Sequence, residues 1–277
     1  MTLVATAELN RAAADAGHGV AAFNVVLLEH AEAFTAAAAQ TGAPLVLQIS
    51  QNCVRYHGGL APLATATLEL ARSAAEPIAV HLDHADDLAL IDEALTLGLG
   101  GVMYDGSHLS DEDNRRTTAE VVARCQARGV SVEAELGEVG GKDGVHDPHA
   151  RTDPAEASRF VDETGVDALA VAVGTSHAMT SRDAVLDHDL IRALRDAVDV
   201  PLVLHGSSGI DDTGLVQAIR SGMTKINMST HLNVRFTEAV RDAVADPSAS
   251  PDPRRYIRAG RDAVQAEAVR LLHLFTL

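Results

Sequence analysis

The chain has 277 residues, with 22 basic and 39 acidic side chains and a formal net charge of −17. This acidic balance argues against a general nucleic-acid or membrane-surface protein, because both partners attract a basic face. Hydrophobic residues make up 47% and charged residues 22%, which is typical of a folded chain and excludes a largely disordered one. We therefore expect no nucleic acid and no membrane among its partners.

The sequence favours a cytoplasmic location. No apolar run approaches the ~18 residues that are needed to span a bilayer. The amino-terminal segment carries Glu8, Arg11 and Asp15 at helix-like spacing, unlike the apolar core of a secretory signal. The two cysteines, Cys53 and Cys125, cannot form a disulfide framework or a CxxC metal site.

Short apolar runs alternate with longer amphipathic stretches along the whole chain. The runs predict strands at 20–24, 44–50, 78–83, 101–105, 130–135, 167–173, 201–205 and 224–228. The stretches between them predict helices, the main ones at 29–40, 62–74, 87–97, 111–127, 154–164, 187–196 and 214–221. Glycines that are expected to end helices precede the next strand in five places: Gly42, Gly98, Gly129, Gly165 and Gly222.

This alternation predicts an α/β protein with a (β/α)8 TIM barrel. Continuous apolar strands separated by helices indicate a parallel sheet that is covered on both faces. Eight such units in about 280 residues favour the barrel, with a doubly wound sheet as the alternative. We expect one domain over 1–277, with the barrel at about 18–230. Extra C-terminal helices at about 231–277, broken near 247–253, are expected to serve oligomer contacts.

Three histidines follow predicted strands at the end where barrel active sites lie. His84, His177 and His205 come after the third, sixth and seventh strands. Three converging imidazoles with an open position are the arrangement of catalytic zinc. The alternative is three unrelated histidines among the 13 in the chain. Asp83, directly before His84, is either a general acid or base or a carboxylate that orients a histidine.

Two further segments suggest how a substrate would be held. His205-Gly-Ser-Ser-Gly209 and Asn227-Met-Ser-Thr230 follow the last two strands, where barrels commonly bind phosphate through backbone N–H groups. An ordinary turn would also explain the first of them. The glycine- and acid-rich stretch 137–149 is too long for a plain turn and predicts a lid, with a surface insertion as the alternative.

These residues, in this order, resemble the class II (metal-dependent) ketose-bisphosphate aldolases, which include fructose-1,6-bisphosphate and tagatose-1,6-bisphosphate aldolases. The resemblance runs from about residue 20 to 230, with a further match at 252–256. Its motifs are HLDH at 81–84, YDGSH at 104–108, VEAELGEVGG at 132–141, AVGTSH at 172–177, LVLHGSSG at 202–209 and KINMST at 225–230.

The resemblance implies a barrel that is assembled as a homodimer or homotetramer and acts on a small phosphorylated sugar. It implies one catalytic Zn²⁺ held by His84, His177 and His205, with Glu135 near the zinc and Asp105 near a second cation position. Some members of the family also use a monovalent cation, Na⁺ or K⁺. Asp83 is then the proton-transfer residue. The implied substrate and phosphate contacts are Asn24, Ser50, Gly206, Ser207, Ser208, Asn227, Met228, Ser229 and Thr230.

The chain departs from the family pattern at three places. Ala178 stands where a glycine usually follows the second zinc histidine, beside the phosphate contacts. The lid is about one residue shorter and contains Lys142, so either the lid acid is Asp143 or Glu138, or this chain has lost it. Val26 replaces a polar residue that is common after Asn24. These departures bear on substrate identity and on the protonation step more than on zinc binding.

We therefore expect a zinc aldolase that reversibly cleaves a ketose 1,6-bisphosphate, with fructose 1,6-bisphosphate favoured. The products would be dihydroxyacetone phosphate and a triose phosphate aldehyde. The alternatives are the same reaction on tagatose 1,6-bisphosphate or another ketose 1-phosphate, and a metal-dependent sugar-phosphate isomerase or epimerase. A Schiff-base aldolase would need a lysine, and the chain has only Lys142 and Lys225. A non-catalytic binding protein is a further alternative.

Overall fold

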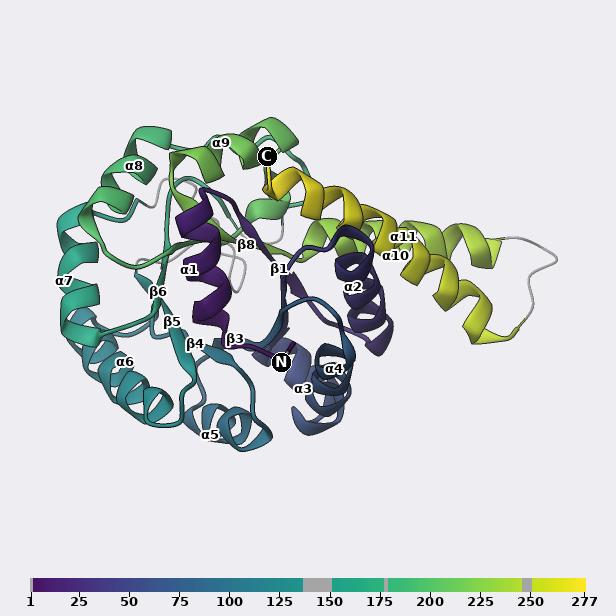
Figure 1. The fold of residues 1–277 in the computed structure, drawn as a ribbon, viewed down its shortest axis with the longest axis horizontal. Coiled ribbons are helices and arrows are strands. Elements are labelled where there is room, and N and C mark those ends of the chain that lie inside the picture. Colours follow the sequence, from purple (N-terminus) through teal and green to yellow (C-terminus); the bar gives the residue numbers. More distant parts are fainter. Residues whose placement is uncertain (1, 137–150, 177–178, 246–250) are drawn as a thin grey trace.

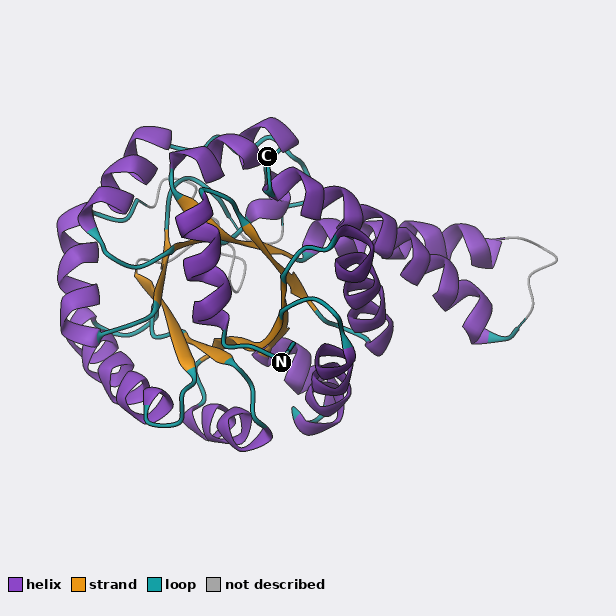
Figure 2. Cartoon of the chain, viewed as in Figure 1, coloured by secondary structure: helices purple, strands orange, loops and turns teal. Residues whose placement is uncertain are grey.

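The computed structural model describes residues 2–136, 151–176, 179–245 and 251–277. These residues form a closed barrel of eight parallel strands in sequence order (Figures 1 and 2). The strands are β1 (Val20–Asn24), β2 (Leu45–Ser50), β3 (Ile78–Ala85), β4 (Gly101–Tyr104), β5 (Ser131–Leu136), β6 (Ala168–Val171), β7 (Leu202–Leu204) and β8 (Met223–Met228). The predicted TIM barrel is therefore confirmed.

Helices surround the barrel and cover its outer face (Figure 2). They are α1 (Thr6–Ala16), α2 (Leu28–Thr41), α3 (Gln51–His57), α4 (Ala61–Ser73), α5 (Leu88–Leu97), α6 (Asp111–Gln126), α7 (Pro154–Thr164), α8 (His188–Ala197), α9 (Asp212–Ser221), α10 (Thr230–Ala245) and α11 (Pro253–Phe275). Between the strands and the helices lies one large apolar core. None of the helices in the described ranges is long and apolar enough to cross a membrane.

Local sequence signals place most helix ends correctly. Left-handed glycines end α2, α5 and α7, and Gly222 ends α9, also with a positive φ. Aspartate and serine side chains accept backbone N–H groups at the starts of α5, α6, α7, α8 and α9. The seven-residue α3 was not predicted, because it directly follows β2 without a loop and its apolar pattern is too short to show a helical period.

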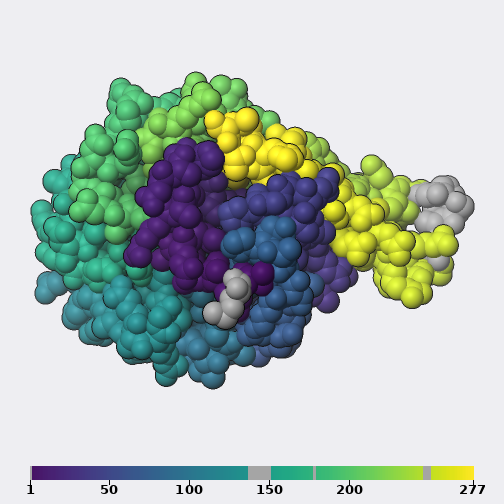
Figure 3. Space-filling view, viewed as in Figure 1, coloured from purple at the N-terminus to yellow at the C-terminus, as the bar shows by residue number. Residues whose placement is uncertain are grey.

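Helix α1 closes the amino-terminal end of the barrel (Figure 1). Leu9 on α1 belongs to a small apolar cluster with Val20, Ala22, Val46 and Ala79, which come from three strands. The space-filling view shows this amino-terminal segment covering the barrel end (Figure 3). The other end, where the strands finish, is thus the end where loops can build a site.

The last two helices, α10 and α11, pack as an antiparallel pair that projects beyond the barrel (Figures 1 and 3). Near the barrel the pair packs on α2. His30 of α2 stacks on Phe236 of α10 with ring centroids 4.8 Å apart, and Arg261 of α11 lies 3.2 Å from Glu32. The imidazole of His30 is buried, and burial lowers its pKa from 6.5 to about 4.

We predict that His30 makes the fold sensitive to acid. Because its pKa is lowered in the folded state, the unfolded chain binds the proton more readily below pH 6.5. His30 therefore contributes a loss of stability as the pH falls from 6.5 to 4, by at most about 1.4 kcal/mol per pH unit. Denaturant unfolding at several pH values should show a shallower acid decline for His30→Phe than for the wild type. Identical slopes in the two proteins would contradict the prediction.

Candidate active site at the mouth of the barrel

A polar pocket of about 210 Å³ opens where the strands end. It collects residues from the ends of β1, β2, β3, β7 and β8, together with the starts of the helices that follow β2 and β8. Its lining residues are Asn24, Gln48, Ser50, Asn52, Asp83, His84, His205, Gly206, Ser207, Ser208, Asn227, Ser229 and Thr230. Eleven of these thirteen were predicted from the sequence; Gln48 and Asn52 were not in the predicted set.

A chain of amides holds the carboxylate of Asp83. Gln48 Nε2 donates to Asn24 Oδ1 over 2.9 Å, and Asn24 Nδ2 donates to Asp83 Oδ2 over 2.9 Å. Asp83 is 2% exposed, and its other oxygen, Oδ1, has no hydrogen-bond partner among the described residues. One oxygen is thus fixed by an amide, while the other is buried without a hydrogen bond in a residue that lines the pocket.

The backbone of β3 turns so that two consecutive residues line the same pocket. His84 has a φ of +49°, a positive value that no other described non-glycine residue shares. At the same place the pairing of β3 with β4 shifts register between Leu82 and Ala85. In a regular strand, neighbouring side chains point to opposite faces. The bulge and the left-handed residue bring both Asp83 and His84 to the pocket.

Three groups that can ligate a metal meet beside Asp83. Ligand atoms of His84, Glu135 and His205 all lie within 4.8 Å of one another, and His84 Nε2 is 2.9 Å from His205 Nδ1. Two imidazole nitrogens and a carboxylate oxygen are a donor set that Zn²⁺ takes in proteins, so these residues fit the implied metal. The side chains come from β3, β5 and the end of β7, which only the closed barrel brings together.

Each of the two imidazoles has a carboxylate at its other nitrogen. Asp105 Oδ2 lies 2.8 Å from His84 Nδ1, and Glu133 Oε1 lies 3.0 Å from His205 Nε2. Such carboxylates fix the orientation and tautomer of a ligand histidine. Asp105, which was predicted near a second cation, thus lies behind His84. Glu133 was not among the predicted site residues of the aldolase, and the sequence suggested it only as a candidate base for the alternative isomerase or epimerase.

The loop after β7 brings two hydroxyl groups to the pocket. Gly206 has a φ of +67°, and a Cβ there would lie 2.6 Å from the carbonyl oxygen of Ser176. Ser207 Oγ donates to the carbonyl of Asn227, and Ser208 Oγ accepts from the N–H of His231 on α10. These contacts tie the loop to the end of β8 and to the start of α10, where helix N–H groups favour an anion.

The remaining predicted residues lie elsewhere. Met228 is fully buried beneath Ser208 Oγ, which lies 3.4 Å from its Sδ, and it does not line the pocket. His177, Ala178 and Asp143 lie outside the described residues, as do Glu138, Lys142 and the stretch 137–149 that was predicted as a lid.

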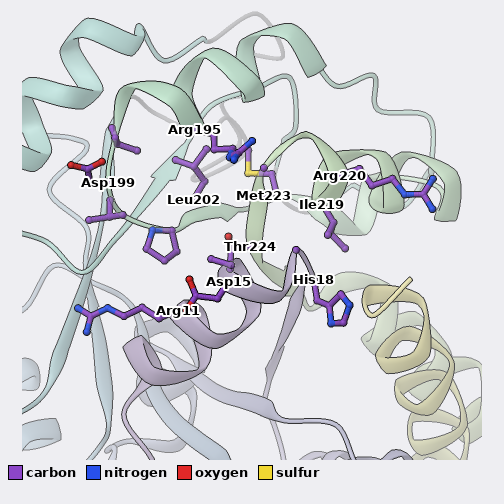
Figure 4. A pocket seen from close by; sticks show the side chains of 16 residues that line it. Arg11, Asp15, His18, Arg195, Asp199, Leu202, Ile219, Arg220, Met223 and Thr224 are labelled. Atoms are coloured by element: carbon purple, nitrogen blue, oxygen red, sulfur yellow. The ribbon is translucent and has the colours of Figure 1, made fainter.

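A larger hollow, of about 450 Å³, lies at the opposite end of the barrel beside α1. In Figure 4, Arg11 and Arg220 point outward on opposite sides of it, while Asp15 and Thr224 lie near its middle. Its charged side chains do not converge on one point. This hollow therefore lacks the converging polar groups of the mouth pocket. The mouth pocket is smaller, but its polar side chains make it the better candidate for an active site.

Comparisons with known proteins show the family of the chain. The family model described as "Fructose-bisphosphate aldolase class-II" matches residues 4–277. The fructose-bisphosphate aldolase of Geobacillus stearothermophilus is 37% identical over 279 residues, covering 99% of this chain and 97% of that protein. The chain therefore belongs to the class II fructose-bisphosphate aldolase family, and it is an enzyme of the lyase class, an aldolase.

Solved structures share the fold over nearly the whole chain. The YdjI aldolase of Escherichia coli K12 superposes with a TM-score of 0.86 at 32% identity, covering 99% of this chain and 97% of that one. A putative fructose-1,6-biphosphate aldolase from Coccidioides immitis superposes with a TM-score of 0.87 at 30% identity, covering 98% and 95%.

We predict that Gly206 cannot be replaced without damage to the site. Gly206→Ala places a Cβ against backbone at a positive φ, so it should cost more stability than the roughly 1–2 kcal/mol of the conformation alone. Gly58→Ala is the matched control, because Gly58 has a φ of +75° but no atom within 4 Å of an added Cβ. Denaturant midpoints should rank wild type first, Gly58→Ala second and Gly206→Ala last. Equal losses in the two variants would show that the contact with Ser176 has no effect.

Proposed function

We propose that this aldolase uses one Zn²⁺ per chain to cleave a ketose 1,6-bisphosphate reversibly, with fructose 1,6-bisphosphate favoured. The products are dihydroxyacetone phosphate and a triose phosphate aldehyde. The observation that carries the proposal is the grouping of His84, Glu135 and His205 beside the buried carboxylate of Asp83. In this proposal His177 completes the set of metal ligands.

In the proposed reaction, the metal, Asp83 and Asn24 have separate roles. When bound, Zn²⁺ acts as a Lewis acid that polarises the ketose carbonyl. Asp83 removes the proton of the C4 hydroxyl group, and the C3–C4 bond breaks as the C4 carbonyl of the aldehyde forms. The bonding electron pair stays with the dihydroxyacetone phosphate half, which then takes up a proton at C3. Asn24 holds the catalytic carboxylate through Oδ2, so Oδ1, which has no hydrogen-bond partner among the described residues, is the oxygen that would accept the proton.

The proposed phosphate contacts are the segments 206–208 and 227–230. No lysine or arginine is among the described residues that line the pocket, so backbone N–H groups, hydroxyl groups and the start of α10 would bind the anion there. A monovalent cation, Na⁺ or K⁺, would offset charge beside the phosphate. The alternative substrates are tagatose 1,6-bisphosphate and another ketose 1-phosphate.

We further propose one domain over the whole chain, a homodimer or homotetramer, and a cytoplasmic location. The projecting pair of α10 and α11 supports contacts between copies, because it extends away from the barrel (Figure 3). Neither nucleic acid nor a membrane is among the proposed partners.

The first prediction concerns the metal. Triose phosphate release from fructose 1,6-bisphosphate should disappear after treatment with a chelator and return when Zn²⁺ is added. His205→Ala should stay inactive with zinc present, because a ligand is missing. Full activity of the metal-free protein would contradict the proposal. Activity of the zinc-loaded protein on a different ketose 1-phosphate alone would establish the alternative substrate.

The second prediction concerns the proton. Asp83→Ala should fold and bind zinc but lose cleavage by ~100-fold or more, as expected when a general acid or base is removed. Asp92→Ala on the outer helix α5 is the control, since the exposed carboxylate of Asp92 pairs with Arg124 and lies away from the pocket lining. Turnover rates and zinc content are measured on all three proteins. Near-normal turnover of Asp83→Ala would remove Asp83 from the mechanism.

A further inference from the structure

A buried ion pair lies inside the barrel beneath the three candidate metal ligands, His84, Glu135 and His205. Lys225 of β8 and Glu133 of β5 are 0% and 2% exposed, and Lys225 Nζ is 2.8 Å from Glu133 Oε2. The two atoms meet outside the angular range of a hydrogen bond, so the contact is mainly one of charge. Barrel interiors are usually filled by apolar branched side chains, which makes this pair an exception.

Burying such a pair in a core carries a large desolvation cost. Removing two charges from water costs several kcal/mol per ion, and well-packed apolar residues in their place are often neutral or stabilising. Stability alone therefore does not explain why Lys225 and Glu133 occupy the interior. An explanation has to come from what the pair touches.

The pair touches a metal-binding histidine. Glu133 uses its second oxygen, Oε1, to contact His205 Nε2 over 3.0 Å. The other nitrogen of that ring, Nδ1, faces His84 Nε2. An ionised carboxylate can only accept a hydrogen bond, so this contact places the proton on Nε2 and leaves the lone pair of Nδ1 toward His84 and Glu135. Asn227 Nδ2 also lies 3.2 Å from Nε2, whereas Asn227 Oδ1 has no hydrogen-bond partner among the described residues. Exchanging the two atoms of that amide lets Oδ1 accept from the same Nε2–H.

A second histidine beside the pair does not supply the balancing charge. His81 Nε2 lies 3.9 Å from Glu133 Oε2, and Thr6 Oγ1 lies 3.3 Å from His81 Nδ1. Burial, together with nearby Lys225, lowers the pKa of His81 to about 3, so its ring is neutral. Lys225 is thus the cation that allows a carboxylate to be buried behind His205.

We propose that Glu133 and Lys225 are positioning residues that hold His205 in the Nε2–H tautomer and so present Nδ1 to the metal. Lys225 holds one carboxylate oxygen, and the other oxygen orients the ring. This role rests on the proposed metal site, but the tautomer itself does not depend on a bound ion. The proposal also gives Lys225 a structural role, because its buried and paired ammonium group is unsuited to attack a substrate carbonyl.

The test uses a double variant that removes both charges together. Glu133→Leu/Lys225→Met leaves no unpaired charge in the core, so it should fold with stability similar to or above that of the wild type. Its affinity for Zn²⁺, measured by competition with a chelator, should nevertheless fall by about 10- to 100-fold. The conservative double variant Glu133→Gln/Lys225→Met also leaves no unpaired charge but keeps an acceptor for Nε2–H, so it should recover part of that loss.

A control and two independent readouts separate positioning from general damage. Asp92→Leu/Arg124→Met removes an exposed ion pair between α5 and α6 and should leave zinc affinity unchanged. The absorption bands of the Co²⁺-substituted protein should shift in the core double variant but not in this control. Imidazole ¹⁵N shifts of the metal-free wild type should show His205 protonated at Nε2, with His205→Gln identifying the signal.

The outcomes distinguish this inference from the proposed function. A wild type that binds no zinc contradicts the proposed metal site, while the ¹⁵N measurement still decides the tautomer. A wild type that binds zinc, together with a folded core double variant of unchanged affinity and unchanged Co²⁺ spectrum, overturns the positioning role. A proton found on Nδ1 of His205 in the metal-free wild type overturns it as well.

Discussion

The closure of eight parallel strands is the constraint on which the rest of this structure depends. Because all strands run the same way, their carboxyl ends meet at one mouth, and α1 fills the other end. Residues as distant in sequence as Asn24, Asp83 and Asn227 then line one pocket. A small shift in the pairing of the strands would separate the ligand atoms of His84 and His205, which come from β3 and the end of β7.

The candidate catalytic and metal-binding side chains at the barrel mouth are fixed by contacts with other polar groups. Asp83 is fixed by an amide chain, while Asp105 and Glu133 contact the far nitrogens of the two imidazoles. Buried polar groups are costly unless they are paired, so a ligand set of this kind needs supporting partners. The two supporting carboxylates differ in depth: Asp105 is near the mouth, whereas Glu133 lies in the barrel interior with Lys225.

Much of the fold could be predicted because its signals are local. The apolar runs placed all eight strands, with ends displaced by two residues at most, and β1 matched at both ends. The glycines that end helices and the aspartates that cap helix amino-termini act on backbone groups only a few residues away. The helix α3 was missed because about two turns of helix joined directly to a strand leave too few residues for a period to show.

The sequence by itself determined the strand–helix alternation and the residue types at the strand ends, because both follow from local periodicity and motif. Only the tertiary structure decided which nitrogen of each histidine ring contacts which partner. The positive φ of His84, the amide chain to Asp83 and the placement of Asp105 behind an imidazole all depend on strand register. The ion pair of Lys225 and Glu133 joins residues 92 positions apart, and only barrel closure brings β5 and β8 side chains to one interior point.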